Sequence, residues 1–281
     1  MIKKSKKMLA AYGMVLPAFL VVMAVVAWPI LEAVKQSFTH PDTGTFTLEN
    51  YKFFFTTPNE IRNLLYTLYV VLVTVFLAIV IAYLLAMYLR FVKSPISRAI
   101  GNLYLVPRFV PGLVAVYAMI TIIRDSGLIN RISQLFGADV ELGMMYHASG
   151  MITMNLWFNI PFAALMITAG LGAIPDSVIE GARDVGANRW KVFTSMVLPL
   201  SIKDVVIAGT FVFMSNVGSF TTPYLMGGNS PKMLGISLFD QFNKYQRYER
   251  AAALSVIIFL ICSVSAGVYI YTNLKEKEWE K

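Results

Sequence analysis

Long apolar runs alternate with short polar segments along most of the chain. Six mainly apolar runs of more than 20 residues cover residues 9–31, 61–89, 99–123, 148–171, 200–225 and 251–271. An α-helix rises 1.5 Å per residue, so each run is long enough to cross about 30 Å of hydrocarbon. The pattern predicts an all-α integral membrane protein with six transmembrane helices, and we expect residues 1–281 to form a single membrane domain.

Some of these runs carry features that disturb a simple helix. Gly101, Pro107, Pro111 and Gly112 interrupt the third run, and a short external helix is expected around residues 128–136. The first run resembles the apolar core of a signal peptide, but it is long for one and no A-x-A-like cleavage site follows. We therefore expect it to be a transmembrane helix.

The composition is typical of an integral membrane protein. Hydrophobic residues make up 57% of the chain and charged residues 14%, whereas soluble domains carry about 25% charged residues. The net charge of +8 comes mainly from lysines and arginines that flank the apolar runs, so a nucleic-acid partner is not expected. The single cysteine, Cys262, lies inside an apolar run and provides neither a disulfide nor a metal site.

The distribution of basic residues predicts the orientation in the membrane. With both termini in the cytoplasm, the cytoplasmic segments hold 14 lysines and arginines and the external segments hold nine. Lys3, Lys4, Lys6 and Lys7 contribute to this bias, and the external segment 226–250, with four basic residues, opposes it. We expect a multi-pass protein of the cell's inner (cytoplasmic) membrane.

Catalytic signatures are missing from the sequence. No G-x-x-x-x-G-K-[ST] phosphate loop occurs, and the only histidines, His40 and His147, fall in expected external loops. The carboxylates avoid the centres of the spans, which argues against an ion-coupled pump. We therefore expect no catalytic residues, no metal site and no ATP hydrolysis by this chain; a membrane-embedded enzyme or scaffold remains the alternative class.

Polar residues within the spans are candidates for a translocation pathway, because hydrocarbon offers them no partners. Arg108 lies in the third span. It is expected to face a cavity or pathway, to reach to the inner headgroups, or to pair at the subunit interface. Asn155 and Asn159 are four residues apart and share one helical face, where they line a path or form bonds between helices. The full candidate set is Arg108, Tyr117, Asn155, Trp157, Asn159, Ser215, Asn216, Ser219 and Thr222.

The segment 175–199 is the most polar stretch between two long apolar runs. Pro175 and Asp176 favour a helix start, Gly186 interrupts the segment, and Leu198-Pro199 ends it. Arg183, Arg189 and Lys191 place it on the cytoplasmic side. We predict a short helix–turn–helix that is presented to a partner in the cytosol, and we call this segment the coupling loop.

The coupling loop resembles the EAA loop of membrane permease subunits of binding-protein-dependent ABC importers. That pattern reads E-A-A, three residues, G, nine residues, I, one residue, L-P. Glu180, Ala182, Gly186, Leu198 and Pro199 match it, while Gly181 and Met196 depart from it. The resemblance implies contact with an ATPase through the coupling-loop residues Glu180, Gly181, Ala182, Asp184, Gly186, Ala187, Arg189, Leu198 and Pro199.

The same resemblance implies the architecture and the partners. It predicts a type I ABC importer permease fold with a cytoplasmic coupling helix. The expected partners are two ATPase subunits, a second and homologous permease subunit, an external solute-binding protein and the lipid bilayer. No cofactor is expected in this chain, because ATP and Mg²⁺ would be bound by the ATPase subunits.

A C-terminal stretch resembles one branch of these importers. SFTTPYLMGGNSPKMLGISLFDQF, followed by AAALSVI, is similar to spermidine/putrescine-type permeases, which implies a polyamine solute. Permeases for aminoethylphosphonate, ferric iron and thiamine share much of this pattern, and a sugar is a further alternative. The charge within the spans does not favour a polycation, because Arg108 is the only charged residue there. A polycation would have to be bound by the aromatic residues Tyr117, Trp157 and Tyr224 or by acidic residues of the partner permease.

Overall fold

Helices make up the architecture throughout the part of the chain that the structure describes. The computed structural model describes the backbone of residues 2–276 and the side chains of residues 12–272. Within that part, pairing between extended segments is confined to one isolated bridge between Thr39 and Phe46. The predicted all-α fold is confirmed. The terminal charges used for the orientation, at residues 3–7 and 275–281, lie outside the described side chains.

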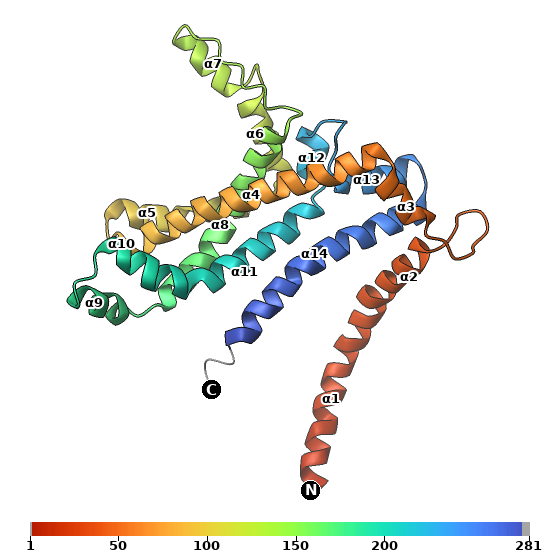
Figure 1. Ribbon diagram of the computed structural model, residues 1–281, viewed down its shortest axis with the longest axis horizontal. Helices are drawn as coiled ribbons and strands as arrows, with labels where there is room; N and C mark the ends of the chain where they lie inside the picture. Colours follow the sequence, from red (N-terminus) through yellow and green to blue (C-terminus); the bar gives the residue numbers. More distant parts are fainter. Residues whose placement is uncertain (1, 277–281) are drawn as a thin grey trace. The chain divides into compact units, whose positions relative to one another are not determined.

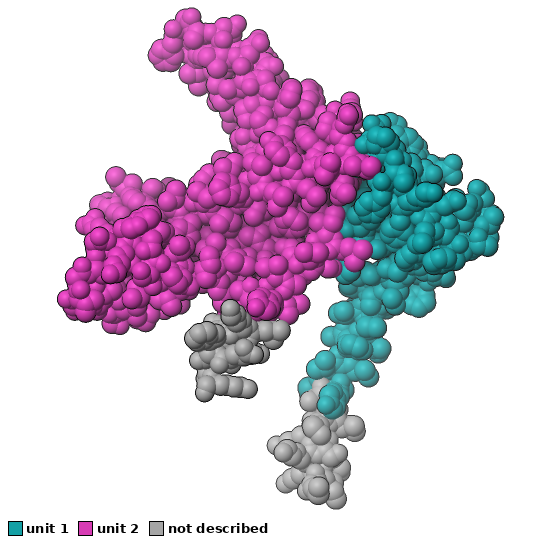
Figure 2. Space-filling view, in the orientation of Figure 1, with its two compact units in different colours: residues 1–60, 238–259 teal, residues 61–237, 260–281 magenta. Residues whose placement is uncertain are grey.

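The chain divides into two compact units, residues 1–60 with 238–259 and residues 61–237 with 260–281 (Figure 2). The helices in chain order are α1 (Ile2–Val22), α2 (Trp28–Ser37), α3 (Glu49–Thr56), α4 (Pro58–Phe91), α5 (Pro95–Leu103), α6 (Gly112–Ile123), α7 (Leu128–Leu135), α8 (Ala148–Ala173), α9 (Asp176–Asp184), α10 (Arg189–Val192), α11 (Leu198–Val217), α12 (Thr221–Met226), α13 (Leu234–Phe239) and α14 (Tyr248–Glu276) (Figure 1).

Six helical segments among the described residues are long and apolar enough to cross a membrane. They are Tyr12–Ser37, Pro58–Phe91, Gly112–Leu135, Ala148–Ala173, Arg189–Val217 and Tyr248–Thr272. The third differs most from the run 99–123 marked in the sequence. Pro107 lies in a short 3₁₀ turn, Val106–Phe109, and Pro111 precedes α6, so residues 95–103 form the separate helix α5. Proline lacks an N–H donor and fixes its φ, which accounts for the break.

The first unit holds the polar segment after the first span in place by hydrogen bonds. Asn50, at the start of α3, donates through Nδ2 to the carbonyl oxygens of Ser37 and Thr39, both at 3.0 Å. The Ser37 hydroxyl lies 2.6 Å from the Tyr51 hydroxyl. The two bonds from Asn50 satisfy carbonyls at the end of α2 and just after it, as buried backbone groups require.

The second unit is built around α4, α8 and α11 (Figure 1). Ala78, Ala82 and Ala86 are four residues apart, so they lie on one face of α4, and all three are fully buried. Ala163 and Ala164 on α8 and Ala208 on α11 belong to the same core. Small side chains let helix backbones approach closely where lipid provides little hydrophobic drive for association.

Gly170 on α8 lies directly against Asp204 on α11. A β-carbon at residue 170 would lie only 2.7 Å from the β-carbon of Asp204 on α11, whereas Gly172 on the same helix has open space around it. A side chain at residue 170 would therefore push these two helices apart. Their separation matters because both helices lead from the coupling loop to the cavity described below.

Candidate functional site

The coupling loop forms the helix–turn–helix that its sequence predicts. Helix α9 (Asp176–Asp184) and the single turn α10 (Arg189–Val192) are joined by residues 185–188. Ile179, Ala182 and Val192 are buried in the core of the second unit, and Glu180 and Asp184 are exposed. One face of the loop is thus anchored to the membrane helices, and the other is available to a partner.

Gly186 ends α9 through a geometry that needs glycine. Its φ is +84°, in the left-handed region. The Gly186 N–H donates to the Arg183 carbonyl at 2.8 Å, and the Ala187 N–H donates to the Ala182 carbonyl at 3.1 Å. This pair of bonds is the Schellman motif, which satisfies the last carbonyls of a helix. Glycine at residue 186 therefore fixes the turn between α9 and α10.

The start of α10 is fixed by a side chain of the same loop. The Asn188 Oδ1 accepts a hydrogen bond from the Lys191 N–H at 2.8 Å, as an N-cap residue does. Leu198 and Pro199 begin α11, which continues from α10 through a π-helical turn, Phe193–Val197, so that Arg189–Val217 is one helical segment. Arg189, the first residue of α10, is exposed.

Two large apolar side chains on the outer face were not singled out by sequence reasoning. Val185 is 85% exposed and Trp190 is 72% exposed. They stand beside the charged residues Asp184 and Arg189. Exposed apolar side chains within a polar rim are typical of an interaction surface. Their signal in the sequence was an apolar residue at each end of the turn, which alone does not reveal exposure.

Arg90 holds the coupling loop to the end of α4. Sequence reasoning did not identify this role of Arg90. Its Nε donates to the Leu171 carbonyl at 3.2 Å, and its Nη2 donates to the Ile174 carbonyl at 3.1 Å. The same Nη2 is paired with the carboxylate of Asp176, the first residue of α9. The guanidinium therefore satisfies carbonyls at the end of α8 and holds the start of α9 at once.

A second site is a cavity of about 260 Å³ inside the second unit, which we call the polar cavity. Its walls come from the 3₁₀ turn 106–109, from α6 and α8, and from the junction of α11 and α12. Helix α11 ends at Val217 and α12 begins at Thr221, which divides the fifth run of the sequence. Seven predicted pathway residues line it: Arg108, Asn155, Asn159, Ser215, Asn216, Ser219 and Thr222.

Hydrogen bonds link the two helices behind the cavity. The Asn159 Nδ2 donates to the Asn155 carbonyl at 2.7 Å and to the Asn216 Oδ1 at 3.4 Å. The Ser215 hydroxyl donates to the Asn159 Oδ1 at 3.4 Å. Asn159 thus lines the cavity and also bonds α8 to α11. The interhelical bonding expected from the sequence is present, and the role of Asn159 in a translocation path stays a prediction.

The polar cavity presents a positive charge and an unpartnered donor. Asn155 is buried, and its Nδ2 has no hydrogen-bond partner among the described residues. The Arg108 guanidinium carbon lies 5.1 Å from the centroid of the Phe162 ring, a cation–π contact. The residues that line the cavity include no carboxylate among those described. Such a cavity can accommodate a solute that accepts hydrogen bonds.

Tyr117 and Trp157 are not among the residues that line the polar cavity. Tyr117 is 53% exposed and Trp157 is 42% exposed. Trp157 is two residues from both Asn155 and Asn159, and residues two apart on a helix face different sides.

Comparisons with known proteins find a matching family and several curated relatives. Residues 78–277 match the family described as "Binding-protein-dependent transport system inner membrane component". The spermidine/putrescine transport system permease protein PotB of Salmonella typhimurium is 23% identical over 262 residues, which cover 89% of this chain and 91% of that protein. The osmoprotective compounds uptake permease protein GgtC of Synechocystis is 28% identical over 264 residues, with 88% and 92% covered.

A solved structure shares the fold over the whole chain. A bacterial ABC transporter involved in the import of the acidic polysaccharide alginate gives a TM-score of 0.82 at 18% identity, with 99% of each chain covered. At this identity the likeness shows the fold alone. The predicted type I importer permease fold is confirmed.

Proposed function

Because the chain belongs to the family of binding-protein-dependent transport system inner membrane components, we propose that it works with separate ATPase subunits to import a small hydrophilic solute. The chain is an ABC importer permease subunit and a multi-pass inner-membrane protein. The proposed complex holds two ATPase subunits, a second homologous permease and an external solute-binding protein. ATP and Mg²⁺ would bind to the ATPase subunits, and both termini would be cytoplasmic.

The anchored coupling loop is the observation that carries this proposal. An ATPase that binds the exposed face, with Val185 and Trp190 at its centre, moves α9 when it closes around ATP. Ile179 and Ala182 bury the other face of α9 against α4, α8 and α11. Any displacement of α9 is therefore passed to the helices that carry the polar cavity.

The path from the coupling loop to the cavity follows single helices. Leu171 on α8 contributes to the core beside the loop, and Asn159 lies 12 residues earlier on the same helix. At 1.5 Å per residue this is roughly 18 Å along one helix, which contains Pro161. Helix α11 similarly begins at Leu198 beside the loop and carries Ser215 and Asn216 to the cavity. A shift of either helix changes the cavity walls, as alternating access requires.

The polar cavity favours a hydroxylated or anionic solute. Arg108 and the Nδ2 of Asn155 both donate hydrogen bonds, and sugars, polyols, phosphonates and carboxylates accept them. A polyamine, the solute implied by the sequence resemblance and by the similarity to PotB, donates instead. We retain it as the second candidate, which requires carboxylates from the partner permease; ferric iron has the same requirement.

The solute class is tested by reconstituting the complex with its binding protein in proteoliposomes. ATP hydrolysis is measured against a panel of polyamines, organic anions, phosphonates, sugars and polyols. We expect stimulation by an anion or a hydroxylated solute. Stimulation by polyamines alone would overturn this assignment and would place the recognising acids on the second permease.

The role of the polar cavity is tested with Asn159→Leu and Ser219→Leu. Each variant removes polar groups from the cavity, and an unmet buried hydrogen bond costs about 1–3 kcal/mol. We therefore expect uptake to fall by about tenfold or more, while the ATPase subunits still co-purify. Trp157→Leu is the matched control on α8, because Trp157 does not line the cavity. Unchanged uptake in both cavity variants would leave Asn159 with a packing role only.

A further inference from the structure

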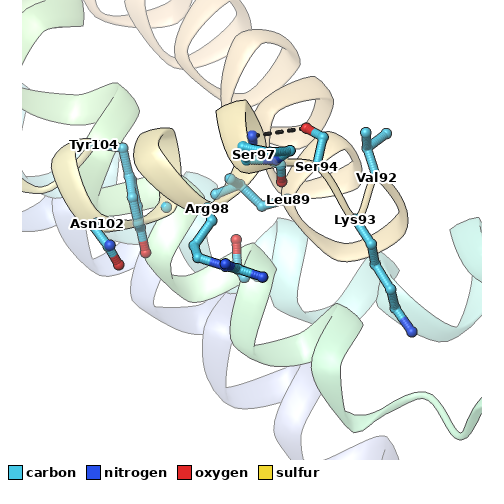
Figure 3. A pocket seen from close by; sticks show the side chains of 11 residues that line it. Leu89, Val92, Lys93, Ser94, Ser97, Arg98, Asn102 and Tyr104 are labelled. Atoms are coloured by element: carbon cyan, nitrogen blue, oxygen red, sulfur yellow. Dashed lines mark hydrogen bonds between the residues drawn. The ribbon is translucent and has the colours of Figure 1, made fainter.

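A second cavity lies at the end of α4, away from the polar cavity. It has a volume of about 560 Å³ and is formed by the last turn of α4, the loop 92–94, helix α5 and one residue of α8. We call it the basic pocket. It is lined by Leu89, Val92, Lys93, Ser94, Pro95, Ser97, Arg98, Gly101, Asn102, Tyr104 and Thr168 (Figure 3).

The charge in the basic pocket is positive and unpaired. Lys93 and Arg98 are exposed and form no ion pair or side-chain hydrogen bond with any described residue. Arg90, at the same end of α4, is by contrast paired with Asp176. No carboxylate lines the pocket among the described residues. Unlike Arg90, these two cations therefore remain available to an external anion.

The polar side chains of the pocket are arranged together. In Figure 3 the side chains of Lys93, Arg98, Asn102 and Tyr104 project toward the same side of α5 and its preceding loop. Ser94 caps α5 by accepting a hydrogen bond from the Ser97 N–H at 3.0 Å, which fixes the helix start beside the two cations. A phosphate oxygen in this niche would find charged, amide and hydroxyl donors within one concave surface.

The opposite face of α5 is apolar and uncovered. Ile96, Ala99 and Leu103 lie at helical spacing, and Ile96 and Leu103 are 66% and 63% exposed. Arg98 and Asn102 are four residues apart and fall on the other side of the helix. A helix with this division lies in the membrane interface, with its apolar face toward the acyl chains and its basic face at headgroup depth.

We propose that the basic pocket binds the phosphate headgroup of an anionic phospholipid. A free anion would use the cations alone, whereas the acyl chains of a lipid also contact the exposed apolar side chains of Val92, at the pocket, and of Ile96 and Leu103, on the other face of α5. Helix α4 ends at Phe91, and its last turn forms one wall of the pocket, which places the pocket at the level of the headgroups. Assignment to the cytoplasmic leaflet rests on the proposed function; the binding itself does not.

The test measures lipid retention by the purified full-length chain with native mass spectrometry. The chain is titrated with phosphatidylglycerol or with phosphatidylcholine of the same acyl chains. We expect phosphatidylglycerol to bind preferentially. The Lys93→Gln/Arg98→Gln variant should bind it about 30-fold more weakly, since each cation near an anionic lipid contributes about fivefold. Arg98→Lys should retain most of the affinity.

Matched variants separate the pocket from general charge. Arg124→Gln/Arg131→Gln removes two exposed cations that lie outside the pocket and should leave the affinity unchanged. Ile96→Ser/Leu103→Ser should weaken the binding of phosphatidylglycerol but not the binding of inorganic phosphate or glycerol phosphate. Each variant sits at an exposed position, and size-exclusion chromatography checks its folding.

Three results would overturn the proposal. The first is equal retention of the two lipids, and the second is full retention of phosphatidylglycerol by Lys93→Gln/Arg98→Gln. The third is binding of inorganic phosphate as tight as that of the lipid, which would assign the pocket to a free anion. Because the readout needs no ATPase, solute or binding protein, its failure is distinct from a failure of the proposed transport function.

Discussion

The Gly186→Leu variant is expected to hydrolyse ATP without importing solute. Residue 186 has a φ of +84°, and a side chain in the left-handed conformation costs about 1–2 kcal/mol. Relief of this strain breaks the bonds from Gly186 to Arg183 and from Ala187 to Ala182, which set the turn between α9 and α10. The membrane helices are not altered, so the protein should still insert. Uptake and ATP hydrolysis are measured together in proteoliposomes.

Gly181 provides the matched control for this variant. It lies on α9, five residues before Gly186; a β-carbon there meets nothing within 4 Å, and its φ is not positive. Gly181→Ala should therefore remain coupled and should strengthen α9, since alanine is favoured over glycine in a helix by about 1 kcal/mol.

Glu180→Lys, a charge reversal on the exposed face, should uncouple the complex as Gly186→Leu does. Normal uptake by both Gly186→Leu and Glu180→Lys would show that the coupling loop does not link ATP hydrolysis to uptake.

The Arg90→Leu variant is expected to lose most solute uptake, although Arg90 lies neither on the exposed face of the coupling loop nor in the polar cavity. Leucine removes the bonds to the carbonyls of Leu171 and Ile174 and the ion pair with Asp176. A hydrogen bond to a charged group contributes about 1.5–3 kcal/mol, and the side chain of Arg90 is only 19% exposed. The start of α9 should then detach from α4, so that its motion no longer reaches α8.

Hydrogen exchange provides a measurement that a general folding defect would not mimic. In Arg90→Leu, residues 174–186 should exchange faster while the buried core of α4 around Ala82 stays protected. Arg90→Lys keeps the charge but not the planar fork, so it should restore uptake in part. Full uptake by Arg90→Leu, with unchanged hydrogen exchange over residues 174–186, would show that the contacts of Arg90 do not transmit movement.

Much of the fold follows from the sequence, because a bilayer demands about 20 apolar residues per crossing. The coupling loop follows as well, since charge and Gly186 mark it between two apolar runs. Pro107, Pro111 and Gly112 mark the break before α6 in the sequence. Residues 99–103 were joined to the third span, although Arg98 and Asn102 give that stretch one polar face and make it part of the amphipathic helix α5.

The candidate sites show where sequence reasoning ends. Polarity identifies Asn155 and Asn159, because an amide in hydrocarbon needs a partner or a cavity. Aromatic residues give no such signal, and the exposed Trp157 could not be assigned a direction before the helix face was known. Arg90 was counted only as a flanking charge, since its partners lie more than 80 residues away in sequence.

The central claim is that the coupling loop faces the cytosol and touches an ATPase, and a single cysteine tests it most directly. Val185→Cys, in a chain whose only native cysteine is replaced by Cys262→Ser, places a thiol on the most exposed part of the turn. We predict that a membrane-impermeant thiol reagent labels it only from the cytoplasmic side and that a short bifunctional reagent cross-links it to the ATPase subunit. Labelling from the external side, or accessible thiols that never cross-link to an ATPase, would contradict the account.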